Sequence, residues 1–202
     1  MNKWDERYSQ HEFVYGLEPN DFLVEQSGRI PPGRVLCLAE GEGRNALHLA
    51  LKGYDVLAVD SSRVGLEKAA RRAQQADVTI HTELADLAEF HIKEGHWQGI
   101  VSIFAHLPPA VRKPLHQQVV AGLAPGGVFI LEAYTPRQLE IGGVGGPGRD
   151  QQDRLMTLME LKDELAGLRL DVAQETDRDV NEGEFHRGRG AVVQIVGIKA
   201  ST

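Results

Sequence analysis

Residues 34–62 read RVLCLAEGEGRNALHLALKGYDVLAVDSS, and they carry the strongest structural signal of the chain. Two short apolar runs, over 34–39 and 54–59, lie on either side of a segment with helical spacing over 44–52. Apolar runs without alternation indicate strands that are buried on both faces, as in a parallel sheet. A glycine-containing turn joins the first strand to its helix. The stretch therefore predicts an α/β fold.

The same alternation continues toward the C-terminus. The spacing predicts helices over 64–76, 110–123 and 153–165, with Ser61 or Ser62 as the N-cap of the first. The segment between the last two predicted strands shows no helical period. Those two strands are therefore predicted to form an antiparallel hairpin, because a parallel pair needs a crossover. The further predicted strands are 78–82, 99–104, 128–133, 168–174 and 191–198.

Composition restricts the class of protein. The 202 residues, 42% hydrophobic and 25% charged, suit one globular domain over 1–202, with an N-terminal segment at 1–33 and a core at 34–202. The net charge of −7 argues against a nucleic-acid binder that neutralises phosphates. A single cysteine, Cys37, leaves no partner for a disulfide within the chain and none for a zinc–thiolate cluster.

The apolar runs, the N-terminus and the histidine spacing lead to expectations about the location of the protein and about metal binding. No apolar run approaches the ~18 residues of a membrane span, and the N-terminus is polar. The eight histidines show no H-E-x-x-H or H-x-x-x-H spacing, so no metal is expected. We expect a soluble, cytoplasmic protein without a membrane or nucleic-acid partner.

Parallel strands place their ligand at their carboxyl ends, and three strands of this chain end in residues suited to one. Gly41 and Gly43 follow the first strand, where glycine lets the backbone turn sharply and approach a ligand. Asp60 ends the second strand, 17 residues after Gly43, and suits the hydroxyl groups of a ribose. Asp86 and Leu87 follow the third, where a carboxylate can accept from the amino group of a purine. Together these strand ends predict a ligand with a ribose and a purine.

Two histidines and an arginine are candidates for catalysis. His106 follows the fourth strand in SIFAHLP. His186 and Arg187 lie in NEGEFHRGRG, inside the predicted hairpin, where a loop held by two strands can place side chains accurately. Histidine can take a proton near neutral pH, and arginine offers planar donors to an anionic substrate. All three are equally open to a structural or solvated role at this stage.

Two segments outside the predicted strands are candidates for a lid. Residues 1–33 contain five aromatic residues, which would be costly to expose unless they cover something. Residues Gly142–Asp150, GGVGGPGRD, are dense in glycine and predict a mobile surface loop. We expect residues 4–20 and 142–150 to close over the ligand. The alternative is an N-terminal helix that serves only the core.

The chain resembles the class I S-adenosylmethionine-dependent methyltransferases. The stretch from Val35 to Ser62 resembles their motifs I and II, Ala85–Leu87 (ADL) their third motif, and LAPGGVFILEAY, from residue 123, the turn and strand after their fifth helix. Within that superfamily the chain is similar to the tellurite-resistance type and its thiopurine-methyltransferase-like relatives. The residues that support this are WDERY (4–8), YGLEPNDFL (15–23), GRN (43–45) and NEGEFHRGRG (181–190).

The resemblance implies a Rossmann-like sheet of seven mostly parallel strands, with an antiparallel last strand and helices on both faces. It implies S-adenosylmethionine as the cofactor, with the glycines beside its methionyl part and the two aspartates on the ribose and the adenine. The family usually has an acid at the position of Cys37 and a glycine at that of Ala39. We expect Glu40 to replace the missing acid beside the cofactor's ammonium group. The cofactor-binding residues expected in all are Glu40, Gly41, Gly43, Asp60, Ser61, Asp86, Leu87 and Phe104.

The expected function is methyl transfer to a small-molecule acceptor by in-line displacement. One alternative is an NAD(P)-dependent oxidoreductase, because GEGRNA with Asp60 also matches a dinucleotide-binding pattern. Another is a catalytically silent S-adenosylmethionine-binding regulator, against which four residues argue: His106, Tyr134, His186 and Arg187. The acceptor and the oligomeric state are left open by the sequence.

Overall fold

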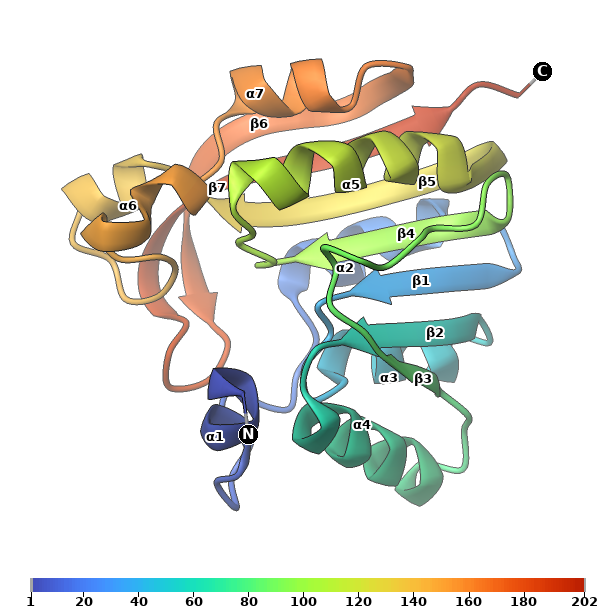
Figure 1. Ribbon diagram of the computed structural model, residues 1–202, viewed down its shortest axis with the longest axis horizontal. Coiled ribbons are helices and arrows are strands. Elements are labelled where there is room, and N and C mark those ends of the chain that lie inside the picture. The colour runs from blue at the N-terminus through green and yellow to red at the C-terminus, as the bar shows by residue number, and fades with distance from the viewer. Residues whose placement is uncertain (1, 202) are drawn as a thin grey trace.

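The computed structural model describes residues 2–201, which form one seven-stranded sheet with helices on both faces (Figure 1). The strands are β1 (Arg34–Leu38), β2 (Asp55–Asp60), β3 (His81–Leu84), β4 (Trp97–Ile103), β5 (Leu123–Tyr134), β6 (Leu168–Asn181) and β7 (Arg187–Lys199). Their order is β3-β2-β1-β4-β5-β7-β6. Strands β1 to β5 pair in parallel, and β7 runs antiparallel to both β5 and β6. The expected fold class is confirmed.

Two apolar clusters bury the two faces of this sheet. Helices α2 (Asp21–Gln26), α3 (Arg44–Leu51) and α4 (Arg63–Gln75) cover one face, and α5 (Pro109–Gly122) and α7 (Leu158–Glu164) cover the other. Figure 1 shows α5 and α7 in front of the sheet, with α2 and α3 behind it. The remaining helical elements are α1 (Lys3–Tyr8), α6 (Arg137–Glu140) and the 3-10 segments η1 (Ser27–Arg29) and η2 (Arg149–Arg154).

Local sequence explains where the helices begin. Ser62 is the N-cap of α4, and its side chain accepts from the backbone N–H of Gly65. Helix α7 begins later than the predicted residue 153, because Thr157 and Glu160 form a capping box there. The chain just before it is extended, and Met156 donates its backbone N–H to the Tyr134 carbonyl at 3.0 Å. The structure therefore divides the predicted helix 153–165 between η2 and α7.

The β6–β7 hairpin is much longer than the sequence indicates. The ladder runs from Leu168↔Lys199 to Asn181↔Arg187, so only residues 182–186 form the turn. Residues 175–181 are mostly polar, so their hydropathy pattern does not indicate a strand. Backbone hydrogen bonds of a ladder do not require apolar side chains, so the polar ribbon extends past the sheet toward α1 (Figure 1).

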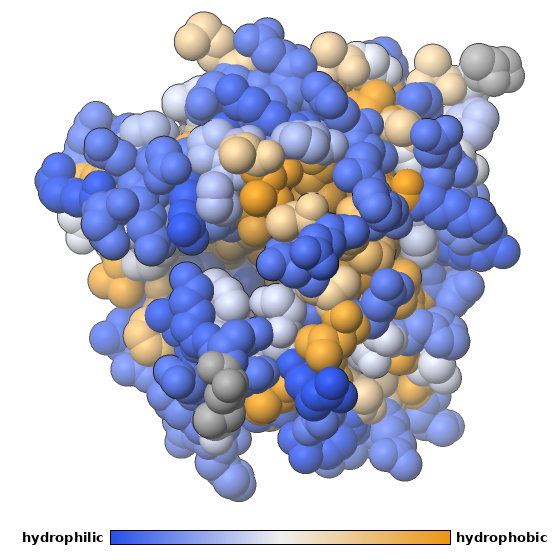
Figure 2. Space-filling model, viewed as in Figure 1, coloured by the Kyte–Doolittle hydropathy of each residue, from blue (hydrophilic) through white to orange (hydrophobic). Residues whose placement is uncertain are grey.

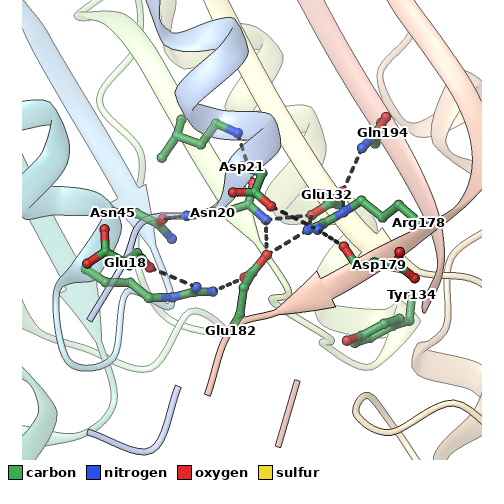
Figure 3. Close-up of polar contacts among 12 residues, drawn as sticks. Glu18, Asn20, Asp21, Asn45, Glu132, Tyr134, Arg178, Asp179, Glu182 and Gln194 are labelled. Carbon is green, nitrogen blue, oxygen red and sulfur yellow. Dashed lines mark hydrogen bonds and ion pairs between the residues drawn. The ribbon is translucent and has the colours of Figure 1, made fainter. Parts of the chain in front are cut away.

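A buried network of charges joins this ribbon to the sheet (Figure 3). Glu132, at the end of β5 and fully buried, accepts from Arg178 Nε at 2.8 Å and from Asn20 Nδ2 at 2.6 Å. Arg178 also donates to Glu182 at 2.7 Å, and Glu182 pairs with Arg44 at the start of α3. Burial alone would lower the pKa of Arg178, but its bonds to Glu132 and Glu182 outweigh burial and raise it.

The N-terminal segment divides into two parts. Helix α2 contributes Phe22 and Leu23 to the core, so residues 21–30 belong to the packed body. The preceding residues lie over the β1–α3 turn. A second buried pair fixes them, because Lys68 on α4 bonds Glu42 at 2.7 Å and the Gln10 carbonyl at 2.7 Å.

A buried carboxylate also joins α5 to α7. Glu164 accepts from Arg112 Nη2 at 2.8 Å and lies 2.6 Å from Nδ1 of His116. Burial would raise the pKa of Glu164, but the hydrogen bonds from His116 and Arg112 lower it to about 2. The ionised form of Glu164 therefore stabilises the folded state.

We expect Glu164→Gln to lower the free energy of unfolding at pH 7 by about 3–5 kcal/mol, because fully buried Arg112 loses its nearest counter-charge and keeps only the longer contact to Glu160 at 3.5 Å. The folded pKa of Glu164 lies below its unfolded value, so its contribution is present above about pH 4.5 and is lost as pH falls toward 2. Urea unfolding at pH 7, 4 and 3 measures this. A difference between variant and wild type that stays constant with pH would contradict the assignment.

Candidate active site

One cavity of about 620 Å³ opens where the carboxyl ends of the parallel strands meet the N-terminal segment. Its walls come from the ends of β1, β2 and β4, from α1, from the loop and 3-10 segment at 144–154, and from the β6–β7 turn. Figure 2, which has the view of Figure 1, shows a hollow in the surface left of the centre. A volume in this range is typical of small-molecule sites. Of the expected site residues, Glu40, Asp60, Ser61, Asp86, Leu87, Phe104, His106 and His186 line it.

The turn after β1 has a backbone that few residues other than glycine adopt. Gly41 and Gly43 have φ of 60° and 84°, and Ala39 has φ of 51°. A Cβ on Gly43 would lie 2.3 Å from that of Ala69 on α4, and one on Gly41 would lie 2.6 Å from the Tyr8 hydroxyl. The two glycines therefore shape the turn and let α4 and α1 approach it. Neither lines the cavity itself.

Asp60 is held rigidly at the end of β2. Its Oδ2 accepts from the backbone N–H of Gly41 at 2.8 Å and its Oδ1 from that of Ser62 at 2.7 Å. Burial raises its pKa above the ordinary value, while these bonds favour the ionised form. Ser62 caps α4, so Asp60 is not needed as the cap, and Ser61 contributes to the lining beside it.

The end of β3 contributes a second acid and an apolar contact. Asp86 is exposed, lines the cavity, and accepts from the backbone N–H of Ala88 at 2.9 Å. Leu87 is buried beside it. On the other side, Phe104 follows β4 with φ of 53° and stacks on Tyr134 with ring centroids 4.6 Å apart. Asp86, Leu87 and Phe104 are thus brought to the cavity that Asp60 also lines.

Glu40 and Glu42 lie two residues apart but differ in their surroundings. Glu42 is paired with Lys68 and accepts from the Val14 backbone N–H at 2.8 Å. Glu40 has no lysine or arginine within ion-pair distance among residues 2–201, and accepts from the Ala46 N–H of α3 at 2.7 Å. Burial raises the pKa of Glu40 to about 7. Glu40 is therefore the acid of this turn without an ion-pair partner among the described residues, and its proton is lost near neutral pH.

Both ring nitrogens of His106 form hydrogen bonds with the main chain. Its Nδ1 lies 3.0 Å from the Phe104 carbonyl, and its Nε2 lies 2.9 Å from the backbone nitrogen of Tyr134. A carbonyl only accepts and an amide N–H only donates, so the proton is on Nδ1 and the lone pair of Nε2 is occupied. Burial lowers the pKa of His106 to about 4. His106 joins the end of β4 to β5, and in this arrangement neither nitrogen is available to a substrate.

His186 and Arg187 are neighbours in the sequence but lie in different environments. His186 is buried in the cavity wall, and its ring centroid lies 4.6 Å from the ring centroids of both Tyr15 and Phe104. Its Nδ1 has no partner among the described residues. Burial, followed by the charge of Arg44, lowers the pKa of His186 well below its ordinary value. Arg187 is exposed at the start of β7 and is not part of the lining. The structure brings only His186 to the site.

The cavity also contains residues that the sequence did not single out. Arg7 belongs to the quoted WDERY stretch, but nothing in the sequence placed its side chain there. Arg154 lies in a polar stretch without a motif. Arg44 stands out in the sequence only as part of the GRN motif at 43–45. Their cavity positions depend on packing between distant segments, for which no local pattern exists.

We expect the His106 ring to stay neutral down to about pH 4, with its proton on Nδ1, because both nitrogens are bonded to the main chain. Ring ¹H–¹⁵N correlation spectra over pH 4–8 measure this, with His106→Gln for assignment. Since the unfolded chain binds this proton near pH 6.5, stability is also lost as pH falls from 6.5 toward 4. A titration midpoint between pH 6 and 7 would refute the bonding pattern.

Among residues 2–201, no helix is long and apolar enough to cross a membrane, and no three His, Cys, Asp or Glu side chains gather as a metal site.

Comparison with known proteins gives matches to methyltransferases. A family model described as a methyltransferase domain matches residues 35–127. The probable S-adenosyl-L-methionine-dependent methyltransferase TehB of Haemophilus influenzae is 32% identical over 74 residues, which cover 37% of this chain and 26% of TehB. Carboxy-S-adenosyl-L-methionine synthase of Pseudoalteromonas atlantica is 30% identical over 119 residues, covering 55% of this chain and 49% of that protein. The matches span half or less of these relatives.

Solved structures share the fold. A structure described under the conversion of a disulfide bond into a thioacetal group in echinomycin biosynthesis has a TM-score of 0.76 at 17% identity, covering 98% of this chain and 88% of the other. The crystal structure of TehB from Haemophilus influenzae has a TM-score of 0.72 at 20% identity, covering 97% and 65%. The cofactor of the matched family is S-adenosylmethionine. Residues 35–127 thus match a methyltransferase domain, and the chain is similar to TehB in sequence and in fold.

Proposed function

We propose that the chain transfers the methyl group of S-adenosylmethionine to a small-molecule acceptor by in-line displacement. One observation carries the proposal. The buried carboxylates of Glu40 and Asp60 and the imidazole of His186, which has an unpartnered nitrogen, line the same cavity of about 620 Å³. Carboxylates suit a cationic donor, and the histidine suits the side where an acceptor would be held. A cytoplasmic location stays a prediction from the sequence.

The residues at the strand ends fit the cofactor. Asp60 is fixed by two backbone N–H groups and retains acceptor capacity for the ribose hydroxyls. Asp86 and Leu87 would hold the adenine. Glu40 would hold the ammonium group, since it is the cavity-lining acid of the first turn without a counter-charge. The cofactor supplies a methyl group made electrophilic by its positively charged sulfur.

The work of the protein is then positioning and exclusion of water. Displacement in line requires donor and acceptor to be held near contact, and this geometry accounts for much of the rate. The rings of Tyr15 and Phe104 limit the space around His186. The neutral His186 would orient the attacking atom or take its proton, while a soft acceptor such as a thiolate needs no base. Arg187 and His106 have no such role in the proposal.

The two alternatives make different predictions. An NAD(P)-dependent oxidoreductase would be stabilised by NAD, and the family match argues against it. A silent S-adenosylmethionine-binding regulator would bind the cofactor product without consuming the donor. Thermal stabilisation by S-adenosylhomocysteine but not by NAD, followed by a screen for methyl-donor consumption with candidate acceptors, tests the proposal. Absence of stabilisation by S-adenosylhomocysteine would overturn it.

We expect Asp60→Ala to weaken S-adenosylhomocysteine binding by about 2–4 kcal/mol, the scale of two lost hydrogen bonds to a carboxylate. Isothermal titration calorimetry measures the affinity, and circular dichroism checks that the variant is folded. Asp55→Ala, at the exposed opposite end of β2, is the matched control and should leave the affinity unchanged. Unchanged affinity in folded Asp60→Ala would remove the ribose assignment.

We propose that residues 4–20 and 142–150 act as the lid. Helix α1 rests on the β2–α4 corner, where Asp5 accepts from the Ser62 hydroxyl at 2.7 Å. The glycine loop lies against the hairpin turn, since a Cβ on Gly145 would be 2.6 Å from the Phe185 carbonyl. Both segments line the cavity and neither belongs to the sheet.

We expect deletion of residues 1–12 to reduce turnover and cofactor affinity about tenfold or more, because the cavity then opens to water. The deletion keeps Asn20 and the buried network, so the thermal midpoint should fall by only a few degrees. Calorimetry with S-adenosylhomocysteine and a thermal melt are run on the same sample. Full affinity in the shortened chain, or its outright unfolding, would contradict the lid role.

A further inference from the structure

The buried acids at the ends of β1 and β2 differ in what balances their charge. Glu42 pairs with Lys68 on α4 at 2.7 Å, and Asp60 accepts from two backbone N–H groups. Glu40 also lines the cavity and is 9% exposed, yet the described residues place no lysine, arginine or histidine nitrogen within ion-pair distance of its carboxyl group. Glu40 is therefore a buried cavity acid without a counter-charge.

The Glu40 carboxyl group is anchored to the start of helix α3. Its Oε1 accepts from the backbone N–H of Ala46, in the first turn of that helix, at 2.7 Å. Since a carboxylate has about four acceptor positions, this bond fixes the orientation of the group and leaves acceptor positions for a ligand. The position of the Glu40 carboxyl group is therefore set before a ligand enters the cavity.

The titratable and charged groups packed around Glu40 come from four elements: Cys37 on β1, Asp60 on β2, Arg44 on α3 and Arg72 on α4. The negative charge of Asp60 opposes ionisation of Glu40, whereas the positive charge of Arg44 favours it. Arg44 is itself paired with Glu182, and Arg72 interacts more strongly with other glutamates than with Glu40. Burial outweighs these charges and raises the pKa of Glu40 to about 7.

The ionised form of Glu40 is costly as long as the cavity holds no cation. Burial of a carboxylate without a paired cation disfavours its charge, and the group responds by binding a proton. A cation that enters the cavity reverses this, because an opposite charge within about 4–6 Å lowers the pKa of a carboxyl group. A cationic ligand and a proton thus compete for Glu40.

We propose that the ammonium group of S-adenosylmethionine displaces a proton from Glu40 on binding, so that the affinity for the cofactor falls as the pH drops below 7. The inference rests on the proposed function, because it takes Glu40 as the partner of the ammonium group. The O–H bond of the Glu40 carboxyl group breaks, the proton leaves to the solvent, and the carboxylate pairs with the ammonium group. The pH thereby regulates how fully the site is loaded with the methyl donor.

The test compares S-adenosylhomocysteine with methylthioadenosine, which has the same adenine, ribose and thioether but no ammonium group. Each is titrated calorimetrically into the full chain in phosphate and in imidazole buffer, whose ionisation enthalpies differ, so that the number of released protons is measured. We expect S-adenosylhomocysteine to release about half a proton at pH 7, and its affinity to fall about tenfold between pH 7.5 and pH 6. Methylthioadenosine should release none, and its affinity should stay constant over that range.

Glu40→Gln keeps the size of the side chain and an acceptor for the Ala46 N–H, but it cannot ionise. We expect its affinity for S-adenosylhomocysteine to be independent of pH in the same range, with no proton released. Glu83→Gln, the same substitution at an exposed glutamate of β3 outside the cavity, is the matched control and should keep the wild-type proton release. If Glu40→Gln does not fold, the comparison of the two ligands on the wild-type chain decides alone.

The outcomes separate the inference from its premise. Binding of S-adenosylhomocysteine without proton release, release that persists in Glu40→Gln, or equal release with methylthioadenosine would overturn the inference and leave the proposed function standing. Failure of S-adenosylhomocysteine to bind at any pH overturns the proposed function, and the inference with it. The two failures are therefore told apart by whether the ligand binds.

Discussion

Glu132 is a carboxylate without solvent exposure, and the hydrogen bonds that it requires hold several distant elements together. It accepts from Arg178 on β6, from Asn20 before α2 and from Gln194 on β7. A buried ion with one partner removed typically costs a protein about 3–5 kcal/mol, so these elements are held together by necessity. Figure 3 shows that the partners come from parts of the chain that are far apart in sequence.

This network connects the two sides of the cavity. Arg178 bonds Glu182 in the hairpin turn, and Glu182 pairs with Arg44 at the first residue of α3. The turn that presents His186 is thereby fixed to the helix that follows the glycine turn. The backbone of Asn20 bonds the Asn45 side chain at 2.9 Å, which fixes the N-terminal segment to the same helix. The hairpin turn, helix α3 and the N-terminal segment thus share one set of buried charges.

Residues of one type perform different work here because their partners differ. His106 has both nitrogens bonded to the main chain, whereas the Nδ1 of His186 has no partner among the described residues. Both Glu40 and Glu42 line the cavity, but Glu42 is neutralised by Lys68, whereas Glu40 has its pKa raised to about 7 by burial. The residue type indicates which chemistry is possible at each position. Burial and partners decide whether that chemistry is available to a ligand.

The sequence by itself determined the sheet and the residues at its strand ends, because these depend on local rules. Apolar runs predict buried strands, Gly41 and Gly43 permit the left-handed turn, and Asp60 follows its strand at a fixed spacing. The part of the cavity around His186 was decided only by the tertiary structure. The polar residues 175–181 form a strand that hydropathy cannot detect, and that strand carries Arg178 to Glu132. The cavity positions of Arg7 and Arg154 and the bonded ring of His106 follow from contacts between distant segments, and such contacts leave no periodic pattern in the sequence.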